Sequence, residues 1–86
     1  MPAYSVYFAR SARRELERLP NEVARRILSR LQDLTTNPRP SGCRKLTGSS
    51  HLWRIRVGDY RVIYEIKDEA LEVDISVIRH RRDAYR

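Results

Sequence analysis

Along the first half of the chain, hydrophobic residues recur at intervals of three and four positions, which is the spacing of one helix face. The clearest series is Val23, Ile27, Leu31 and Leu34. The pattern predicts one helix over residues 11–19, which Pro20 ends, and a second helix from there to Asn37-Pro38. Because so few residues separate the helices, we expect an antiparallel helical hairpin, preceded by a short strand over residues 5–8.

From Leu52 onward the spacing changes to two, which is the alternation of half-buried strands. The strands are predicted over residues 51–57, 60–66 and 71–78. Their short connections favour an antiparallel meander, whereas residues 38–50 are rich in Pro, Ser, Gly and Thr and predict an irregular segment. These elements predict one α+β domain over residues 1–86. Its first strand joins a mostly antiparallel four-stranded sheet, the helical hairpin covers one face, and a short basic tail or turn of helix ends the chain.

The same alternation sorts the side chains of the predicted sheet into two faces. One face is apolar and we expect the helices to cover it: Trp53, Ile55, Val57, Tyr60, Val62, Tyr64, Ile66, Leu71, Val73, Ile75 and Val77. The other face is expected to stay open: Leu52, Arg54, Arg56, Arg61, Ile63, Glu65, Glu72, Asp74, Ser76, Ile78 and, if strand pairing continues, His80. The aromatic residues of the apolar set are interpreted as core residues and not as stacking platforms for bases.

The distribution of charge along the chain indicates what kind of partner the protein binds. The chain has 18 Lys and Arg against 11 Asp and Glu, a formal net charge of +7. Residues 41–64 have a net charge of +4, residues 65–78 of −4, and residues 79–86 of +3. The last strand therefore delivers a basic tail beside strands that already bear arginines, which favours a polyanionic or acidic partner.

The lone Cys43 cannot form an internal disulfide, and the first residues lack the charged and apolar regions of a signal peptide. No apolar run approaches the roughly 18 to 20 residues that cross a bilayer. We therefore expect a cytoplasmic protein that does not associate with membranes.

Cleavage of RNA without a metal needs a base for the 2′-hydroxyl, a proton donor for the leaving oxygen, and cations that stabilise the phosphorane. Arg54, Arg56 and Arg61 suit the last role because a guanidinium binds two phosphate oxygens at once. His80 and Tyr85 are the titratable candidates for proton transfer. Glu72 and Asp74 more often form cross-strand ion pairs than metal sites, so we expect no metal and no cofactor. Without further support, the strand arginines are equally well interpreted as solvated charge.

Two segments resemble the RelE branch of the RelE/ParE toxin superfamily. Residues 52–65, LWRIRVGDYRVIYE, are similar to the central hairpin of RelE-type toxins, and residues 75–86, ISVIRHRRDAYR, to the closing strand and the basic end that contains a tyrosine. The resemblance implies the toxin of a type II toxin–antitoxin system, an endoribonuclease that enters the ribosomal A site and cuts mRNA. It also implies an acidic antitoxin that holds the toxin inactive in a hetero-oligomer.

Residue roles follow from the resemblance only where the motifs match. Arg61 matches the catalytic strand arginine, and Arg54 and Arg56 match the basic pair on the preceding strand. Tyr85 matches the terminal tyrosine, which acts as the base or as a stacking and orienting group, and either His80 or Arg81 occupies the acid position. Further phosphate contacts are expected from Arg44, Lys45 and Arg82.

Two other functions remain open. ParE-type relatives share the fold but inhibit DNA gyrase by binding, and need no nuclease site. A basic RNA-binding accessory protein that is not a toxin would also suit the net charge.

Overall fold

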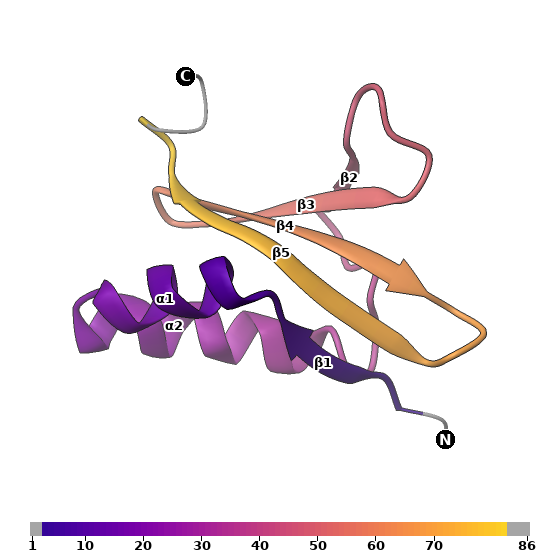
Figure 1. Cartoon of the computed structure of the whole chain (residues 1–86), viewed down its shortest axis with the longest axis horizontal. Coiled ribbons are helices and arrows are strands. Elements are labelled where there is room, and N and C mark those ends of the chain that lie inside the picture. Colours follow the sequence, from indigo (N-terminus) through magenta and orange to yellow (C-terminus); the bar gives the residue numbers. More distant parts are fainter. Residues whose placement is uncertain (1–2, 83–86) are drawn as a thin grey trace.

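A five-stranded sheet with both helices on one face forms the computed structural model, which describes residues 3–82 (Figure 1). The elements are β1 (Ser5–Phe8), α1 (Arg10–Arg18), α2 (Asn21–Asp33), β2 (Arg44–Lys45), β3 (Leu52–Val57), β4 (Tyr60–Lys67) and β5 (Glu72–His80). The strand order is β1-β5-β4-β3-β2, with β1 parallel to β5 and the other pairs antiparallel. The predicted α+β class is confirmed. The predicted sheet of four strands gains a fifth, β2, within the segment that was expected to be irregular.

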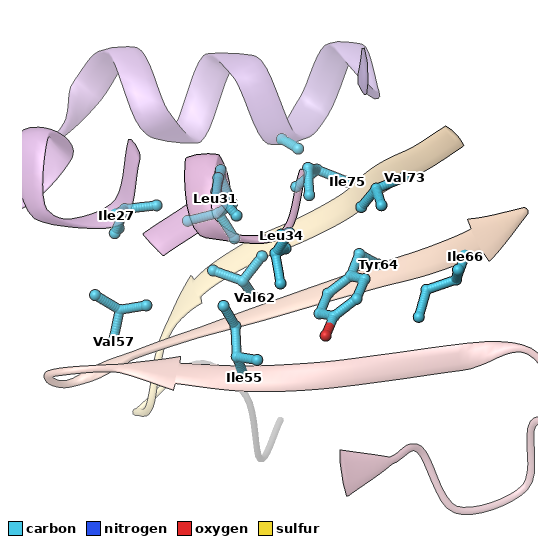
Figure 2. Close-up of a cluster of buried hydrophobic side chains, with 12 residues drawn as sticks. Ile27, Leu31, Leu34, Ile55, Val57, Val62, Tyr64, Ile66, Val73 and Ile75 are labelled. Carbon is cyan, nitrogen blue, oxygen red and sulfur yellow. The ribbon is translucent and has the colours of Figure 1, made fainter. Parts of the chain in front are cut away.

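Side chains from both layers meet in one hydrophobic core (Figure 2). The helices contribute Ala12 of α1 and, from the predicted apolar series of α2, Ile27 and Leu31, all at most 2% exposed. At the centre Tyr64 is fully buried, and its hydroxyl donates a hydrogen bond of 2.8 Å to the Pro38 carbonyl oxygen. Burial raises the pKa of Tyr64, because the ring sits where a phenolate would be poorly solvated.

A β-bulge interrupts the alternation of β5. Ile63 pairs with Val77 and the adjacent Tyr64 pairs with Ile75, so Ser76 is the extra residue. Ile78 is consequently buried at 0% exposure, while Val77 is half-buried. The predictions that Val77 belongs to the core and Ile78 to the open face are therefore wrong, because alternation alone does not foresee an inserted residue.

The same bulge changes the position of the charged end of β5. His80 pairs with Tyr60. Tyr60 shares its face of β4 with Val62 and Tyr64, which belong to the core, so His80 lies on the helical side of the sheet. The prediction that His80 stands on the open face is wrong for this reason. Arg79 pairs with Arg61 and takes that place on the open face.

The β4–β5 turn is fastened to two distant segments through Asp68. Its carboxylate accepts a hydrogen bond of 2.6 Å from the Tyr4 hydroxyl and two from the Arg39 guanidinium, at 3.2 and 2.8 Å. Arg39 also lies over the Trp53 ring, 5.2 Å from its centroid. Through Arg39, the connection between α2 and β2 is held against the β4–β5 turn and against Trp53 of β3.

Within residues 3–82, no helix has the length and apolar character needed to cross a membrane.

Candidate nucleic-acid interface

Three arginines form a row across the open face of the sheet. Arg56 of β3 is registered opposite Arg61 of β4, which is in turn opposite Arg79 of β5. On the other edge of β3, Arg44 of β2 is registered opposite Arg54. Directly opposed residues of an antiparallel pair stand about 5 Å apart at Cβ, so these guanidinium groups repel one another unless an anion lies between them.

A hollow of about 330 Å³ opens at one end of this row. It is lined by Arg56, Gly58, Asp59, Tyr60, Arg61, Arg81 and Arg82. The tail reaches it because the Arg81 amide donates a hydrogen bond of 2.7 Å to the Asp59 carbonyl oxygen, in the β3–β4 turn. Gly58 permits that turn with a φ of +60°. Four of the predicted site arginines are thus brought together at one place, which we call the tail hollow.

A second hollow, of about 680 Å³, adjoins the first through Arg61. It is lined by Cys43, Arg44, Lys45, Leu46, Thr47, Trp53, Arg54 and Arg61. The predicted phosphate-binding residues Arg44, Lys45 and Arg54 therefore lie next to the tail hollow, and we call their site the β2 hollow. The Lys45 ammonium lies 6.0 Å from the centroid of the Trp53 ring, which places it beside the indole.

His80 is not brought together with these residues. Its ring packs edge-on against Tyr60, with centroids 5.2 Å apart and an angle of 87° between the planes. Its Nδ1 accepts a hydrogen bond of 3.2 Å from the Arg82 amide. His80 thus supports the start of the tail from the helical side. Tyr85 lies outside the described residues.

Arg79 is the site residue that sequence reasoning missed. Its exposed side chain lies beside Arg61 on the open face, where strict alternation predicted His80. No signal in a single sequence marks the bulge at Ser76 that produces the exchange. The density of arginines in residues 79–82 was the available hint, but it does not say which one faces the strand arginines.

Ion pairs lie away from the arginine row. The predicted pairing of Glu72 and Asp74 is found, with Lys67 as the partner, at 3.6 and 3.0 Å. Among residues 3–82, no carboxylate lies within 4.0 Å of the cationic groups of Arg54, Arg56 and Arg79. The same part of the chain has no group of three His, Cys, Asp or Glu side chains that could hold a metal ion. The open face is therefore divided into a basic half, which holds the arginine row, and an acidic half around Lys67.

Comparison with known proteins places the chain in a family. The family described as the ParE toxin of the type II toxin–antitoxin system parDE matches residues 6–85. Toxin RelG of Mycobacterium tuberculosis is 36% identical, over 96% of this chain and 97% of the relative. Toxin RelE of the same organism is 34% identical, over 96% and 87%. Among solved structures, the archaeal RelE–RelB complex from Pyrococcus horikoshii matches with a TM-score of 0.82 and 31% identity, covering 94% of this chain and 97% of that one. The sequence, the fold and these relatives agree that the chain belongs to the RelE/ParE superfamily of toxins from type II toxin–antitoxin systems.

Proposed function

We propose that this toxin is an endoribonuclease that cuts translated mRNA in the ribosomal A site, by acid–base chemistry that uses no metal. The observation that carries the proposal is the register of Arg56, Arg61 and Arg79, which places three arginines in one row beside a hollow of about 330 Å³. Arginine suits this task because its fork of donors matches the oxygens of a phosphate. The similarity to Toxin RelG and Toxin RelE of Mycobacterium tuberculosis supports this target. Acting on mRNA also implies work in the cytoplasm.

In the proposed reaction the 2′-oxygen attacks the neighbouring phosphorus and the bond from phosphorus to the 5′-oxygen breaks. The products are a 2′,3′-cyclic phosphate and a 5′-hydroxyl. Tyr85 is proposed to take the proton of the 2′-hydroxyl, or to orient the nucleotide while a water molecule takes that proton. Arg61, with Arg56 and Arg79, stabilises the charge of the phosphorane, a role for which preorganised donors are effective.

The leaving 5′-oxygen also needs stabilisation and a proton. Sequence reasoning left His80 and Arg81 as candidates, and the geometry favours Arg81, since Arg81 lines the tail hollow and His80 packs on Tyr60. We propose that the guanidinium of Arg81 donates a hydrogen bond to the departing oxygen, which takes its proton from water in the open hollow. Arg82, Arg54, Arg44 and Lys45 are proposed to bind the flanking phosphates.

An acidic antitoxin is the proposed protein partner. The solved RelE chains that this fold matches include complexes with RelB from Pyrococcus horikoshii and Methanococcus jannaschii. A chain with a net charge of +7 would be stabilised by a partner that brings carboxylates. The inactive form is proposed to be a hetero-oligomer in which the antitoxin blocks access of RNA to the arginine row.

To test this proposal, the purified chain is added to translating ribosomes and the new RNA ends are mapped. We expect 5′-hydroxyl ends within translated messages, and we expect Arg61→Ala to abolish them while the matched control Arg25→Ala, on the exposed face of α2, does not. Growth arrest by the wild-type chain with intact messages would overturn the proposal.

Inhibition of gyrase is a second candidate, favoured by the ParE description of the matching family. A supercoiling assay with purified gyrase separates the two, because only a gyrase-directed toxin blocks supercoiling directly. A basic accessory protein that is not a toxin would instead leave growth unaffected when expressed without a partner.

A further inference from the structure

A third hollow, of about 430 Å³, lies at the outer edge of β3. It is lined by Arg30, Ser41, Gly42, Arg44, Arg54 and Arg56. Arg30 belongs to α2 and is half-buried, so this hollow, unlike the tail hollow and the β2 hollow, includes a guanidinium group supplied by the helical layer. We call it the edge hollow.

Strand pairing explains why the sheet is open at this place. β2 pairs with β3 through Arg44 opposite Arg54 and Lys45 opposite Trp53, and the pairing does not extend to residues 55–57. Ser41 and Gly42, from the connection that leads to β2, line the hollow instead. The open face and the helical layer therefore meet at this edge without a covering strand.

The chemistry of the edge hollow is that of an anion site. Four of its six lining residues are arginines, and among residues 3–82 no carboxylate lies within 4.0 Å of their guanidinium groups. A Cβ built on Gly42, which has a φ of +92°, would meet nothing within 4 Å, so the backbone here is accessible to a ligand. Like charges at this density destabilise the site until an anion enters.

Arg54 and Arg56 connect the edge hollow to the other two. Arg56 also lines the tail hollow, while Arg44 and Arg54 also line the β2 hollow. The three hollows thus form one continuous basic path from Arg82 to Arg30. A polymer with a charge at every unit fits such a path, and the edge hollow contains no apolar side chain that could take up the hydrophobic residues of a peptide.

We propose that the edge hollow binds a phosphate of the RNA strand outside the scissile linkage, and that Arg30 is the residue that distinguishes this subsite. The proposal rests on the proposed function in one respect, that the ligand is the same RNA whose cleavage the tail hollow would perform. The edge hollow positions the strand and takes no part in the chemical step.

The test measures binding of the full chain to a single-stranded RNA with 2′-O-methyl groups throughout, which cannot be cleaved, at several salt concentrations. Each phosphate contact contributes about 0.7 to the slope of log affinity against log salt for single strands. We expect Arg30→Gln to lower the slope by about that amount and the affinity by roughly three- to tenfold. Arg30→Lys should retain most of the slope because the charge remains.

The control is Arg25→Gln, which removes the same charge from an exposed position on the same helix. It should change the slope by much less than Arg30→Gln. Circular dichroism at the binding temperature checks that each variant is folded. If Arg30→Gln is not folded, Arg30→Met, which removes the charge but keeps a side chain of similar length, replaces it in the same measurement.

A wild-type slope for Arg30→Gln, equal losses for Arg25→Gln and Arg30→Gln, or no RNA binding by the wild-type chain would overturn the edge subsite. Cleavage on ribosomes is measured separately with the Arg61→Ala variant. Absence of cleavage would therefore overturn the proposed nuclease while the salt slope of Arg30→Gln still decides the subsite.

Discussion

Arg61 stands between two residues of its own kind, Arg56 on β3 and Arg79 on β5. Like charges directly opposite one another in a sheet oppose folding, by a few tenths to about 1 kcal/mol for each pair. Such an arrangement makes physical sense where the native ligand carries the opposite charge. The arginines of the row are therefore expected to lower the stability of the free fold and to strengthen the binding of an anionic ligand.

Replacement of Arg79 should therefore separate activity from stability. We expect Arg79→Ala to lower the rate of RNA cleavage by about 10²- to 10³-fold, since it removes a donor that we propose stabilises the phosphorane. Its thermal midpoint should stay level or rise. The comparison is His80→Ala, which removes a ring that packs on Tyr60 and should affect cleavage less than Arg79→Ala. Equal rates for wild type and Arg79→Ala would remove Arg79 from the site.

Asp68 gives a second prediction, on the pH dependence of stability. Its hydrogen bonds with Arg39 and Tyr4 lower the pKa of the carboxyl from 3.8 to about 2 in the folded chain. Because the folded-state pKa is depressed, the stabilisation is fully present above about pH 4 and is lost as pH falls toward 2. The effect is small, because the side chains of Arg39 and Asp68 are 42% and 53% exposed and water screens the pair.

Urea unfolding of wild type and Asp68→Asn between pH 6 and pH 2 measures this contribution. The difference between their midpoints should be largest near neutral pH and should shrink as the carboxyl is protonated. A difference that is constant over this range would show that the Asp68 carboxylate does not stabilise the fold through its charge.

The bulge in β5 determines which side chains of this strand lie on the open face. The extra residue, Ser76, leaves Ile75 and Ile78 both in the core, three positions apart, where a regular strand would turn them to opposite faces. The end of β5 is thereby set so that Arg79 faces Arg61. The bulge is thus the local feature on which the row of three arginines depends.

Two alanine variants test the register of β5. Ile78→Ala should lower the free energy of unfolding by about 2–5 kcal/mol, because it leaves a cavity in a closely packed core. The half-buried Val77 lies on the opposite face, so Val77→Ala should have a much smaller effect. Chemical denaturation of both variants measures the difference. A larger loss for Val77→Ala would mean that β5 alternates without a bulge.

The sequence predicts much of the fold because helix spacing and strand alternation report burial directly. Ile27, Leu31 and Tyr64 were all placed in the core from their spacing alone. What could not be predicted depends on contacts between distant segments. The pairing of Arg44 and Lys45 with β3 needs a tertiary partner that local composition does not reveal. Nothing in the sequence distinguishes Arg30 from the other arginines of α2. Only the folded structure brings Ser41 and Gly42, in the connection before β2, to the hollow that Arg30 lines.

Considered as a whole, the molecule has one core to which α1, α2, β3, β4 and β5 all contribute buried side chains. Elements that share a core of this size are expected to unfold together, since none of them can bury its apolar face alone. Trp53 reports on the basic edge of the sheet, where Arg39 and Lys45 lie near its ring. Far-ultraviolet circular dichroism reports on all the helices and strands.

The fluorescence of Trp53 and the circular dichroism signal should therefore change together in a denaturant titration, with coincident midpoints. The physical reason is that Trp53 packs against the core while it also lies among the cations of the edge. A fluorescence transition at clearly lower denaturant would show that the basic edge opens before the rest of the fold.

The pairing of β1 with β5 joins residues 5–8 to residues 72–75, two segments that lie far apart in the sequence. Ser5 finds its partner Glu72 only after the intervening helices and strands exist, and such non-local pairs are late and slow to form. While the polypeptide is still being made, the arginine that β5 contributes has not yet joined its counterparts. A nascent chain that has not yet reached β5 therefore lacks the complete row of Arg56, Arg61 and Arg79, and a neutralising partner can be supplied before that row forms.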